Sequence, residues 1–196
     1  KVTTPVEVVE KAKKLQTIFD RIEFVDLRIC FIIEQMEKSF LNEKIKILQN
    51  GSDTKKVAAL EDKQKIKRQE LMDIRDFINQ CNNPGEFLED EKIARLEEIS
   101  KMTWTDFDGN EQPFLNEDEV LNLSIRRGSI TESERKKMQN HAAVTLKMLK
   151  KIPFTKKLKN IPLYAGAHHE FINGGGYPLG LKGDEIPFEG KIMCVT

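Results

Sequence analysis

The sequence contains few cysteines and no long apolar run, and each shortage excludes a class of protein. The three cysteines, Cys30, Cys81 and Cys194, are odd in number, widely spaced and without CxxC grouping, which argues against a disulfide scaffold or a thiolate zinc site. No apolar run approaches the ~18 to 20 residues that span a bilayer, and the N-terminus lacks the pattern of a signal peptide. We therefore expect a soluble protein of a reducing compartment, the cytoplasm, with no membrane segment in this chain.

A net charge is also lacking. The sequence balances 32 lysine and arginine residues against 32 aspartate and glutamate residues, so no global field attracts a polyanion such as DNA. Any nucleotide must be held locally. The length of 196 residues suits one domain with an elaboration or two small domains, and it allows a substantial core.

The N-terminal part of the sequence predicts a long helix. Thr4, Pro5 and Glu7 form a helix start, with Thr4 as the N-cap and Glu7 closing a capping box. Apolar residues then recur at three- and four-residue spacing over residues 8–48. This pattern predicts one helix that continues to about Leu48.

A second long helix is predicted to fold back against the first. Asn50 and Gly51 end the first helix, and Ser52 or Asp53 caps another that runs to about Cys81. Arms of about 28 residues would each reach about 42 Å. Helices of that length suggest a dimer seam or a signalling arm, and a solvated hairpin packed on its own domain is an equally open interpretation.

Shorter elements follow the break at residues 82–85. Residues 86–100 suggest a short helix, and residues 104–114 alternate around Asp108 and Gly109, which predicts a β-hairpin. Helical character returns from Asn116.

The same β-hairpin imitates part of a calcium loop. Asp106, Asp108 and Asn110 have the spacing of the first half of such a loop, but the required glycine at the sixth position is missing and Pro113 interrupts the segment. Calcium binding is therefore disfavoured.

A capping box of Thr131 and Glu134 predicts a helix that runs to about Lys151 and carries His141. We expect His141 to point toward the core or a cavity in it, because its neighbours mark a buried face: Met138, Val144, Thr145 and Met148. Taken alone, such a histidine is more often a hydrogen-bonded core residue than a metal ligand.

The most informative stretch is residues 168–183. It joins His168, His169 and Glu170 to a loop with three consecutive glycines and Pro178. Glycines permit positive φ and close approach of the backbone, while proline fixes its own φ. Adjacent imidazoles can aim two nitrogens at neighbouring metal ions, so the stretch favours a metal site. The plainer alternative is a helix-end histidine pair followed by an ordinary loop.

The pattern HHE-x-x-(D/N)-G-x-G-Y-P-x-G-L-x-G-x-x-I-P resembles the HD-GYP domain, a branch of the HD phosphohydrolases, and the resemblance is dense over residues 128–196. It implies an all-α, HD-like helical bundle, here with a long inserted helical hairpin and one short β-hairpin. By this resemblance, residues 1–19 start the HD-GYP core, residues 20–115 form the insertion and residues 116–196 complete the core. The implied activity is a metal-dependent phosphodiesterase that hydrolyses a cyclic dinucleotide such as cyclic di-GMP to the linear dinucleotide or GMP.

The resemblance also implies the site residues. Two or three divalent metal ions, iron or manganese, would bind to His141, His168 and His169. Lys1 would be the lysine of the HD-x-G-K signature, a catalytic residue that faces a substrate phosphate. The substrate-binding residues would be Gly176, Tyr177, Pro178 and Lys182.

Parts of the family pattern differ or are expected outside this sequence. The His-Asp pair of the signature would precede Lys1, and another metal-binding aspartate would follow Thr196, so we expect residues 1–196 alone to be inactive. Phe171 stands where many members have a basic residue, and Asn173 stands where aspartate is usual. Asn173 can keep the turn but supplies no charge.

Competing functions remain open from the sequence. The leading hypothesis is the cyclic-dinucleotide phosphodiesterase of bacterial signalling. The alternatives are a degenerate HD-GYP domain that senses a nucleotide or docks a protein without turnover, and a related phosphohydrolase for another nucleotide. The expected partners are the cyclic dinucleotide, an upstream sensory or receiver domain of the same protein, and a second copy of the chain bound through the helical hairpin.

Overall fold

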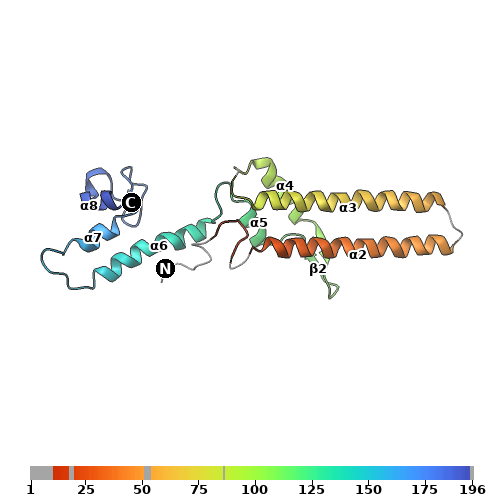
Figure 1. The fold of residues 1–196 in the computed structure, drawn as a ribbon, viewed down its shortest axis with the longest axis horizontal. Helices are drawn as coiled ribbons and strands as arrows, with labels where there is room; N and C mark the ends of the chain where they lie inside the picture. The colour runs from red at the N-terminus through yellow and green to blue at the C-terminus, as the bar shows by residue number, and fades with distance from the viewer. Residues whose placement is uncertain (1–10, 18–19, 51–53, 86, 195–196) are drawn as a thin grey trace. The chain divides into compact units, whose positions relative to one another are not determined.

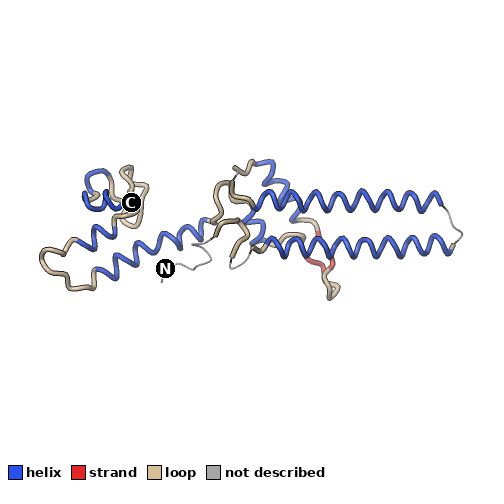
Figure 2. Tube along the Cα trace, viewed as in Figure 1, coloured by secondary structure: helices blue, strands red, loops and turns tan. Residues whose placement is uncertain are grey.

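The computed structural model describes residues 11–17, 20–50, 54–85 and 87–194. These residues form seven α-helices, one 3₁₀ turn and one two-stranded sheet (Figures 1 and 2), which confirms the all-α prediction. The elements are α2 (Ile22–Gln49), α3 (Thr54–Asn82), α4 (Asp90–Ser100), β1 (Thr103–Thr105), β2 (Glu111–Pro113), α5 (Glu117–Leu123), α6 (Glu132–Leu149), α7 (Ile161–Gly166), η1 (Gly183–Glu185) and α8 (Phe188–Met193).

The described residues divide into two compact units, 11–130 and 131–194. The first holds the helices from α2 to α5 and the sheet, and the second holds α6, α7, η1 and α8. The boundaries that the family resemblance suggests, 1–19, 20–115 and 116–196, stay a prediction. No helix among the described residues is both long enough and apolar enough to cross a membrane.

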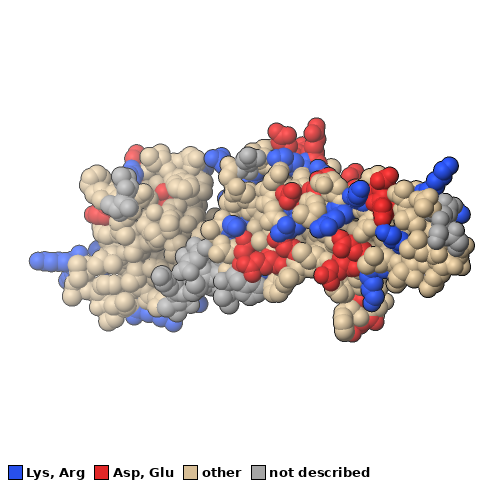
Figure 3. Space-filling model, turned by 45° about the vertical axis from the view of Figure 1, so that its right-hand side comes forward, with Lys and Arg blue, Asp and Glu red and all other residues tan. Residues whose placement is uncertain are grey.

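Helices α2 and α3 form the predicted long hairpin and lie side by side in Figure 1. Their lengths of 28 and 29 residues agree with the predicted arms. Ion pairs join the two helices, including Lys44 to Glu61 at 2.6 Å and Arg75 to Asp26 at 2.7 Å. Figure 3 shows basic and acidic side chains interspersed over the hairpin. Gly51, in the predicted turn, lies outside the described residues.

The core of the first unit lies at the base of the hairpin. Helix α2 buries residues at three- and four-residue spacing, which places them on one face. Helices α4 and α5 and the segment after β2 close this face. The fully buried side chains come from five elements or their flanks and include Leu15, Ile29, Ile78, Leu96, Phe114 and Leu123.

The predicted helix over residues 8–48 is wrong at its start, because residues 11–17 are not helical and α2 begins at Ile22. The backbone N–H of Leu15 donates to Asn82 Oδ1 at 2.8 Å instead of to a carbonyl four residues earlier. Lys11 and Lys14 are buried, with their amines donating to Asn122 Oδ1 and the Leu123 carbonyl. Contacts with α3 and α5 therefore override the local helical pattern. The cap predicted at Thr4 lies outside the described residues.

The short elements mostly confirm the sequence pattern. Strands β1 and β2 pair antiparallel around the predicted turn. The Asp106 carboxylate accepts hydrogen bonds from the backbone N–H groups of Asp108 and Asn110 and from the Gln112 side chain, so the aspartate-rich motif stabilises the turn. Helix α4 starts at Asp90 rather than at residue 86, because the chain before it is extended and Leu88 N–H donates to the Arg126 carbonyl.

The second unit begins with the predicted capping box. Thr131 caps α6 and Glu134 closes the box. The predicted buried face of α6 is partly wrong, since Met148 is 60% exposed whereas Ala142 and Leu146 are the buried residues of the helix. Leu146 faces Gly166 of α7, and a residue two positions further along a helix points to the other side.

Candidate metal centre

Small residues bring the histidine-bearing segments together. A Cβ atom on Gly166, the last residue of α7, would lie 3.0 Å from Leu146 Cδ1, so glycine allows α7 to pack closely on α6. A Cβ atom on Gly190 of α8 would lie 2.9 Å from the Ala167 Cβ. These two contacts involve Gly166 and Ala167 at the end of α7, and His168 and His169 are the next two residues.

The three predicted histidines converge. One ring nitrogen from each of His141, His168 and His169 lies within 4.8 Å of the others. The Nε2 atoms of His141 and His169 are 3.1 Å apart, and the ring centroids of His168 and His169 are 4.0 Å apart. Helix α6 and the segment after α7 therefore supply one half-buried cluster of imidazoles.

Hydrogen bonds orient two of the rings. His141 Nδ1 lies against the Met138 carbonyl, and His168 Nδ1 lies against the Ala165 carbonyl. A carbonyl oxygen only accepts, so each Nδ1 carries the proton and donates it. In the neutral rings, the lone pair is then on Nε2, the atom that His141 turns toward His169.

The surroundings favour a neutral His169. Burial lowers the pKa of its imidazole below the ordinary value of 6.5, and the neighbouring His168 and His141 lower it further. A neutral imidazole is the form that binds a metal ion.

The role of Glu170 is not apparent from the sequence. Its side chain is 2% exposed, and its carboxylate accepts hydrogen bonds from the backbone N–H groups of Leu179 at 2.6 Å, Gly180 at 3.1 Å and Leu181 at 2.8 Å. Glu170 therefore folds the glycine-rich loop back onto the histidine pair. In the sequence, this role is indicated only by an acidic residue shortly before a glycine-rich loop, whose backbone N–H groups need acceptors.

The Gly176-Tyr177-Pro178 turn packs directly on the histidines. A Cβ atom on Gly176 would lie 2.3 Å from Phe171 N and 2.5 Å from the His169 carbonyl oxygen, so only glycine fits. Tyr177 N–H donates to that carbonyl at 3.1 Å, and the Tyr177 ring stacks on His169 with centroids 4.8 Å apart. Burial raises the pKa of Tyr177, and the Tyr177–Pro178 peptide bond is cis. The substrate-binding role of this turn stays a prediction.

The other loop residues support its shape. Asn173 Oδ1 accepts from Gly175 N–H at 2.9 Å, so this asparagine does keep the turn. A Cβ atom on Gly174 would lie 2.5 Å from Lys182 Cγ and Cε, which places the Lys182 stem along the loop. The Phe171 side chain is exposed. Lys1, the predicted catalytic lysine, lies outside the described residues.

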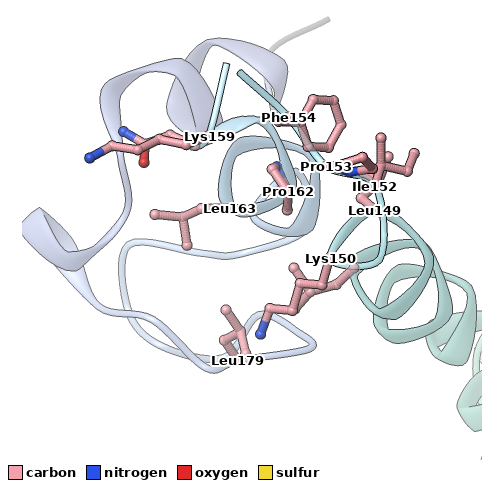
Figure 4. Close-up of a pocket in the computed structure, with 11 residues that line it drawn as sticks. Leu149, Lys150, Ile152, Pro153, Phe154, Lys159, Pro162, Leu163 and Leu179 are labelled. Atoms are coloured by element: carbon pink, nitrogen blue, oxygen red, sulfur yellow. The ribbon is translucent and has the colours of Figure 1, made fainter. Parts of the chain in front are cut away.

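Two of the pockets formed by the described residues lie in this unit, and the histidines line neither of these two. One, of about 450 Å³, is lined by residues of α6, α7 and their connection, where Lys150 points toward Leu179 (Figure 4). The other, of about 510 Å³, is lined by Glu170, residues 171–173, Ile186, Lys191 and Cys194. Cys194 Sγ lies 3.2 Å from the His168 carbonyl.

The cluster's donor set fits a divalent metal ion. Two ligand atoms at right angles, each about 2.1 Å from one ion, are about 3 Å apart, and the two Nε2 atoms are 3.1 Å apart. Three neutral imidazoles offset none of the charge of the ion, so carboxylate ligands are also needed. The described residues contribute only the imidazoles, because the Glu170 carboxylate is occupied by backbone N–H groups.

Comparisons with known proteins agree with this geometry. Residues 118–196 match the HD domain family. The chain is 43% identical over 70 residues to a 3′3′-cGAMP-specific phosphodiesterase of Vibrio cholerae. It is 35% identical over 80 residues to a probable cyclic di-GMP phosphodiesterase of the same organism. It is 34% identical over 72 residues to the cyclic di-GMP phosphodiesterase response regulator RpfG of Xanthomonas campestris.

These matches are partial. They cover 35%, 38% and 37% of this chain and 14%, 18% and 19% of the relatives, so the chain spans less than a fifth of each relative's length. No solved structure matches the chain significantly. The matched segment contains the histidine cluster, Glu170 and the glycine-rich loop. Residues 118–196 are therefore similar to the HD domain family, which is consistent with the resemblance that the sequence motifs indicated.

Proposed function

We propose that residues 118–196 form part of a metal-dependent phosphodiesterase that hydrolyses a cyclic dinucleotide, such as cyclic di-GMP, to the linear dinucleotide or GMP. The observation that supports this proposal best is the convergence of three imidazoles, two with a lone pair on Nε2, beside a loop held by Glu170. His141, His168 and His169 are the proposed ligands of two or three divalent ions, iron or manganese. Further ligands are required from outside the described residues.

Each part of the site has a separate task in this proposal. A bound divalent ion would polarise a phosphoryl oxygen and supply a nucleophile near neutral pH. Tyr177 holds His169 in place by stacking, and Glu170 keeps the turn that carries Tyr177 closed. Residues 135–159 contain nine basic residues and no acidic one, so this part of a chain without net charge attracts the phosphates of the substrate. Lys182 would contact a phosphate and Lys1 would face another.

The remaining parts of the proposal concern the cellular setting. The described cysteines, Cys30, Cys81 and Cys194, are all unpaired, which supports a location in the cytoplasm. One relative is named a response regulator, and we propose that a sensory or receiver domain of the same protein controls this site. A second copy of the chain is proposed to bind through the α2–α3 hairpin.

The test is hydrolysis of cyclic di-GMP and 3′3′-cGAMP by the intact protein loaded with manganese or iron. His168→Ala and His169→Ala should each lower the rate by at least about 100-fold, because a metal ligand is lost without a large apolar cavity. Lys63→Ala, at an exposed position of α3, is the control and should keep the wild-type rate.

Other outcomes distinguish the alternatives. Tight binding of the dinucleotide by metal-loaded protein without turnover would favour a sensing module. Hydrolysis of a different nucleotide with neither cyclic dinucleotide cleaved would favour a related phosphohydrolase. Full turnover by a metal-loaded double variant of His168 and His169 would exclude both residues from catalysis.

A further inference from the structure

Helix α2 carries an apolar stripe on the face turned away from the core. Its buried residues, among them Ile29 and Ile33, lie on the opposite face, against α3 and the base of the hairpin. The outward stripe follows a heptad spacing of three and four residues over about three and a half heptads, and its apolar members are Phe24, Leu27, Phe31, Leu41, Ile45 and Leu48. Leu27 is 65% exposed and Leu41 is 57% exposed.

The two middle positions of the stripe are charged. Continuing the same spacing through the helix places Glu34 and Lys38 between Phe31 and Leu41, and both are exposed. The pattern is therefore three apolar positions, one acidic, one basic and three apolar positions. This order is symmetric about Met36, with the two charges reversed in sign.

Helix α3 shows that such a stripe is not a general property of the hairpin. Among its described residues, Ile66 is the one large apolar side chain that is strongly exposed, and the rest of its outward surface is mostly charged or polar. A solvated hairpin needs two outward faces like that of α3. The stripe on α2 instead has the composition of a helix that packs against a partner.

We propose that α2 packs antiparallel against α2 of a second copy of this chain, about a two-fold axis at the height of Met36. This arrangement places apolar residues opposite apolar residues and sets each Glu34 against Lys38 of the other copy. The facing pairs are Phe24 with Leu48, Leu27 with Ile45, Phe31 with Leu41, and Glu34 with Lys38. An isologous dimer requires this self-complementarity of one surface.

The charges select the orientation. A parallel, in-register dimer would set Glu34 against Glu34 and Lys38 against Lys38, and like charges in a seam destabilise it. The antiparallel dimer has two attractive contacts in their place. A lipid surface or an unrelated protein gives no reason for charges of opposite sign at symmetric positions.

The seam is long enough for a stable interface. Residues 24–48 extend about 36 Å along the helix axis. Trp104 packs edge-on against Phe31, with ring centroids 5.8 Å apart, so Phe31 is half-buried and the β-hairpin borders the seam. The interface concerns the first compact unit and goes beyond the proposed catalytic function, on which it does not depend.

The first test uses charge reversal and sedimentation equilibrium of the full chain. Glu34→Lys and Lys38→Glu should each raise the dissociation constant of the homodimer by at least about tenfold, because each places like charges opposite each other twice. An equimolar mixture of the two variants should recover dimers, since in the mixed dimer the lysines of one variant face the glutamates of the other at both contacts. Lys63→Glu, at an exposed position of α3, is the control and should leave the association unchanged.

The second test measures orientation by disulfide crosslinking in a background with Cys30→Ser and Cys194→Ser. Leu27→Cys mixed with Ile45→Cys should crosslink readily, whereas Leu27→Cys alone should not, because the two copies of residue 27 would be about 27 Å apart. Crosslinking of Leu27→Cys with itself would overturn the antiparallel arrangement. A wild-type chain with intact α2 that stays monomeric at the highest measurable concentrations would overturn the dimer.

Discussion

At the scale of single residues, the candidate site depends on Glu170 and Gly176, although neither is a proposed metal ligand. Glu170 holds three successive N–H groups of the loop, and Gly176 leaves room for the backbone of residues 169–171. Both positions fix where Tyr177 stacks on His169. The arrangement of the imidazoles is thus set by the loop as well as by α6 and α7.

Glu170→Gln tests the carboxylate. The amide keeps the shape but replaces one acceptor oxygen with a donor, which leaves at least one buried N–H group of the loop without an acceptor. We expect the free energy of unfolding to fall by about 1–3 kcal/mol, measured by urea denaturation, and phosphodiester hydrolysis to fall with it. Glu189→Gln, at an exposed position of α8, is the matched control. Equal losses in the two variants would mean that the carboxylate does not organise the loop.

Gly176→Ala tests the close approach of the loop. The added methyl group meets backbone atoms at 2.3–2.5 Å, which cannot move as a flexible side chain would. We expect a loss of about 1–3 kcal/mol in stability and a weaker metal site. Gly85→Ala is the control, because the nearest atom to its added Cβ is 3.7 Å away. A Gly176→Ala variant as stable as Gly85→Ala would contradict the packing described for the turn.

The lowered pKa of His169 predicts a pH dependence of stability in the metal-free protein. Below pH 6.5, the ordinary pKa of histidine, the unfolded chain binds a proton at this residue that the folded chain does not bind. The free energy of unfolding should therefore fall as the pH falls through 6.5 toward the folded pKa, and this contribution levels off below it. Urea denaturation from about pH 8 to about pH 5 measures the slope. His169→Gln should lose this part of the slope, and identical slopes would contradict the assignment.

At the scale of elements, the sequence predicted the features that depend on contacts between residues close to one another in the chain. The capping box at Thr131 and Glu134 and the turn at Asp108 and Gly109 involve residues within a few positions of one another, so a short stretch of sequence reveals them. The start of α2 is different, because the burial of Lys14 depends on the carbonyl of Leu123, 109 residues away. The spacing of apolar residues within a helix gives no information about a contact between residues so far apart in the sequence.

The candidate site also combines features that the sequence reveals with features that it does not reveal. The paired histidines and the glycines are visible as a motif, and the resemblance added His141. The role of Glu170 was not visible, because it depends on the loop folding back over nine to eleven residues. The approach of α6 to α7 depends on Gly166 facing Leu146, which a single sequence does not reveal.

Arg28 links α2 to α5 and to the residue after β2, and it provides a test at this scale. Its guanidinium makes two hydrogen bonds of 2.9 Å to Glu119, which is 5% exposed, and a third to the Phe114 carbonyl. Arg28→Met should cost about 3 kcal/mol of stability, because the buried Glu119 carboxylate loses its cationic partner. Lys67→Ala breaks an exposed ion pair with Glu70 and should cost less than about 1 kcal/mol. Chemical denaturation compares the two, and equal costs would contradict the structural role of Arg28.

At the scale of the whole molecule, the chain combines a segment that matches the HD domain family with a long hairpin that the match does not include. The histidine cluster lies in one compact unit and the apolar stripe of α2 lies in the other. The proposed hydrolysis and the proposed dimer can therefore fail separately. Variants of Glu34 and Lys38 test the second without changing a proposed ligand.

The central claim is that His141, His168 and His169 bind metal together, and X-ray diffraction tests it most directly. Crystals of the protein grown with manganese should show an anomalous difference peak within about 2.2 Å of the Nε2 atoms of His141 and His169, with His168 as a ligand of the same ion or of a neighbour about 3.5–4 Å away. His169→Ala crystals should lose or weaken that peak. A fully loaded protein whose anomalous peaks all lie away from these three imidazoles would contradict the account.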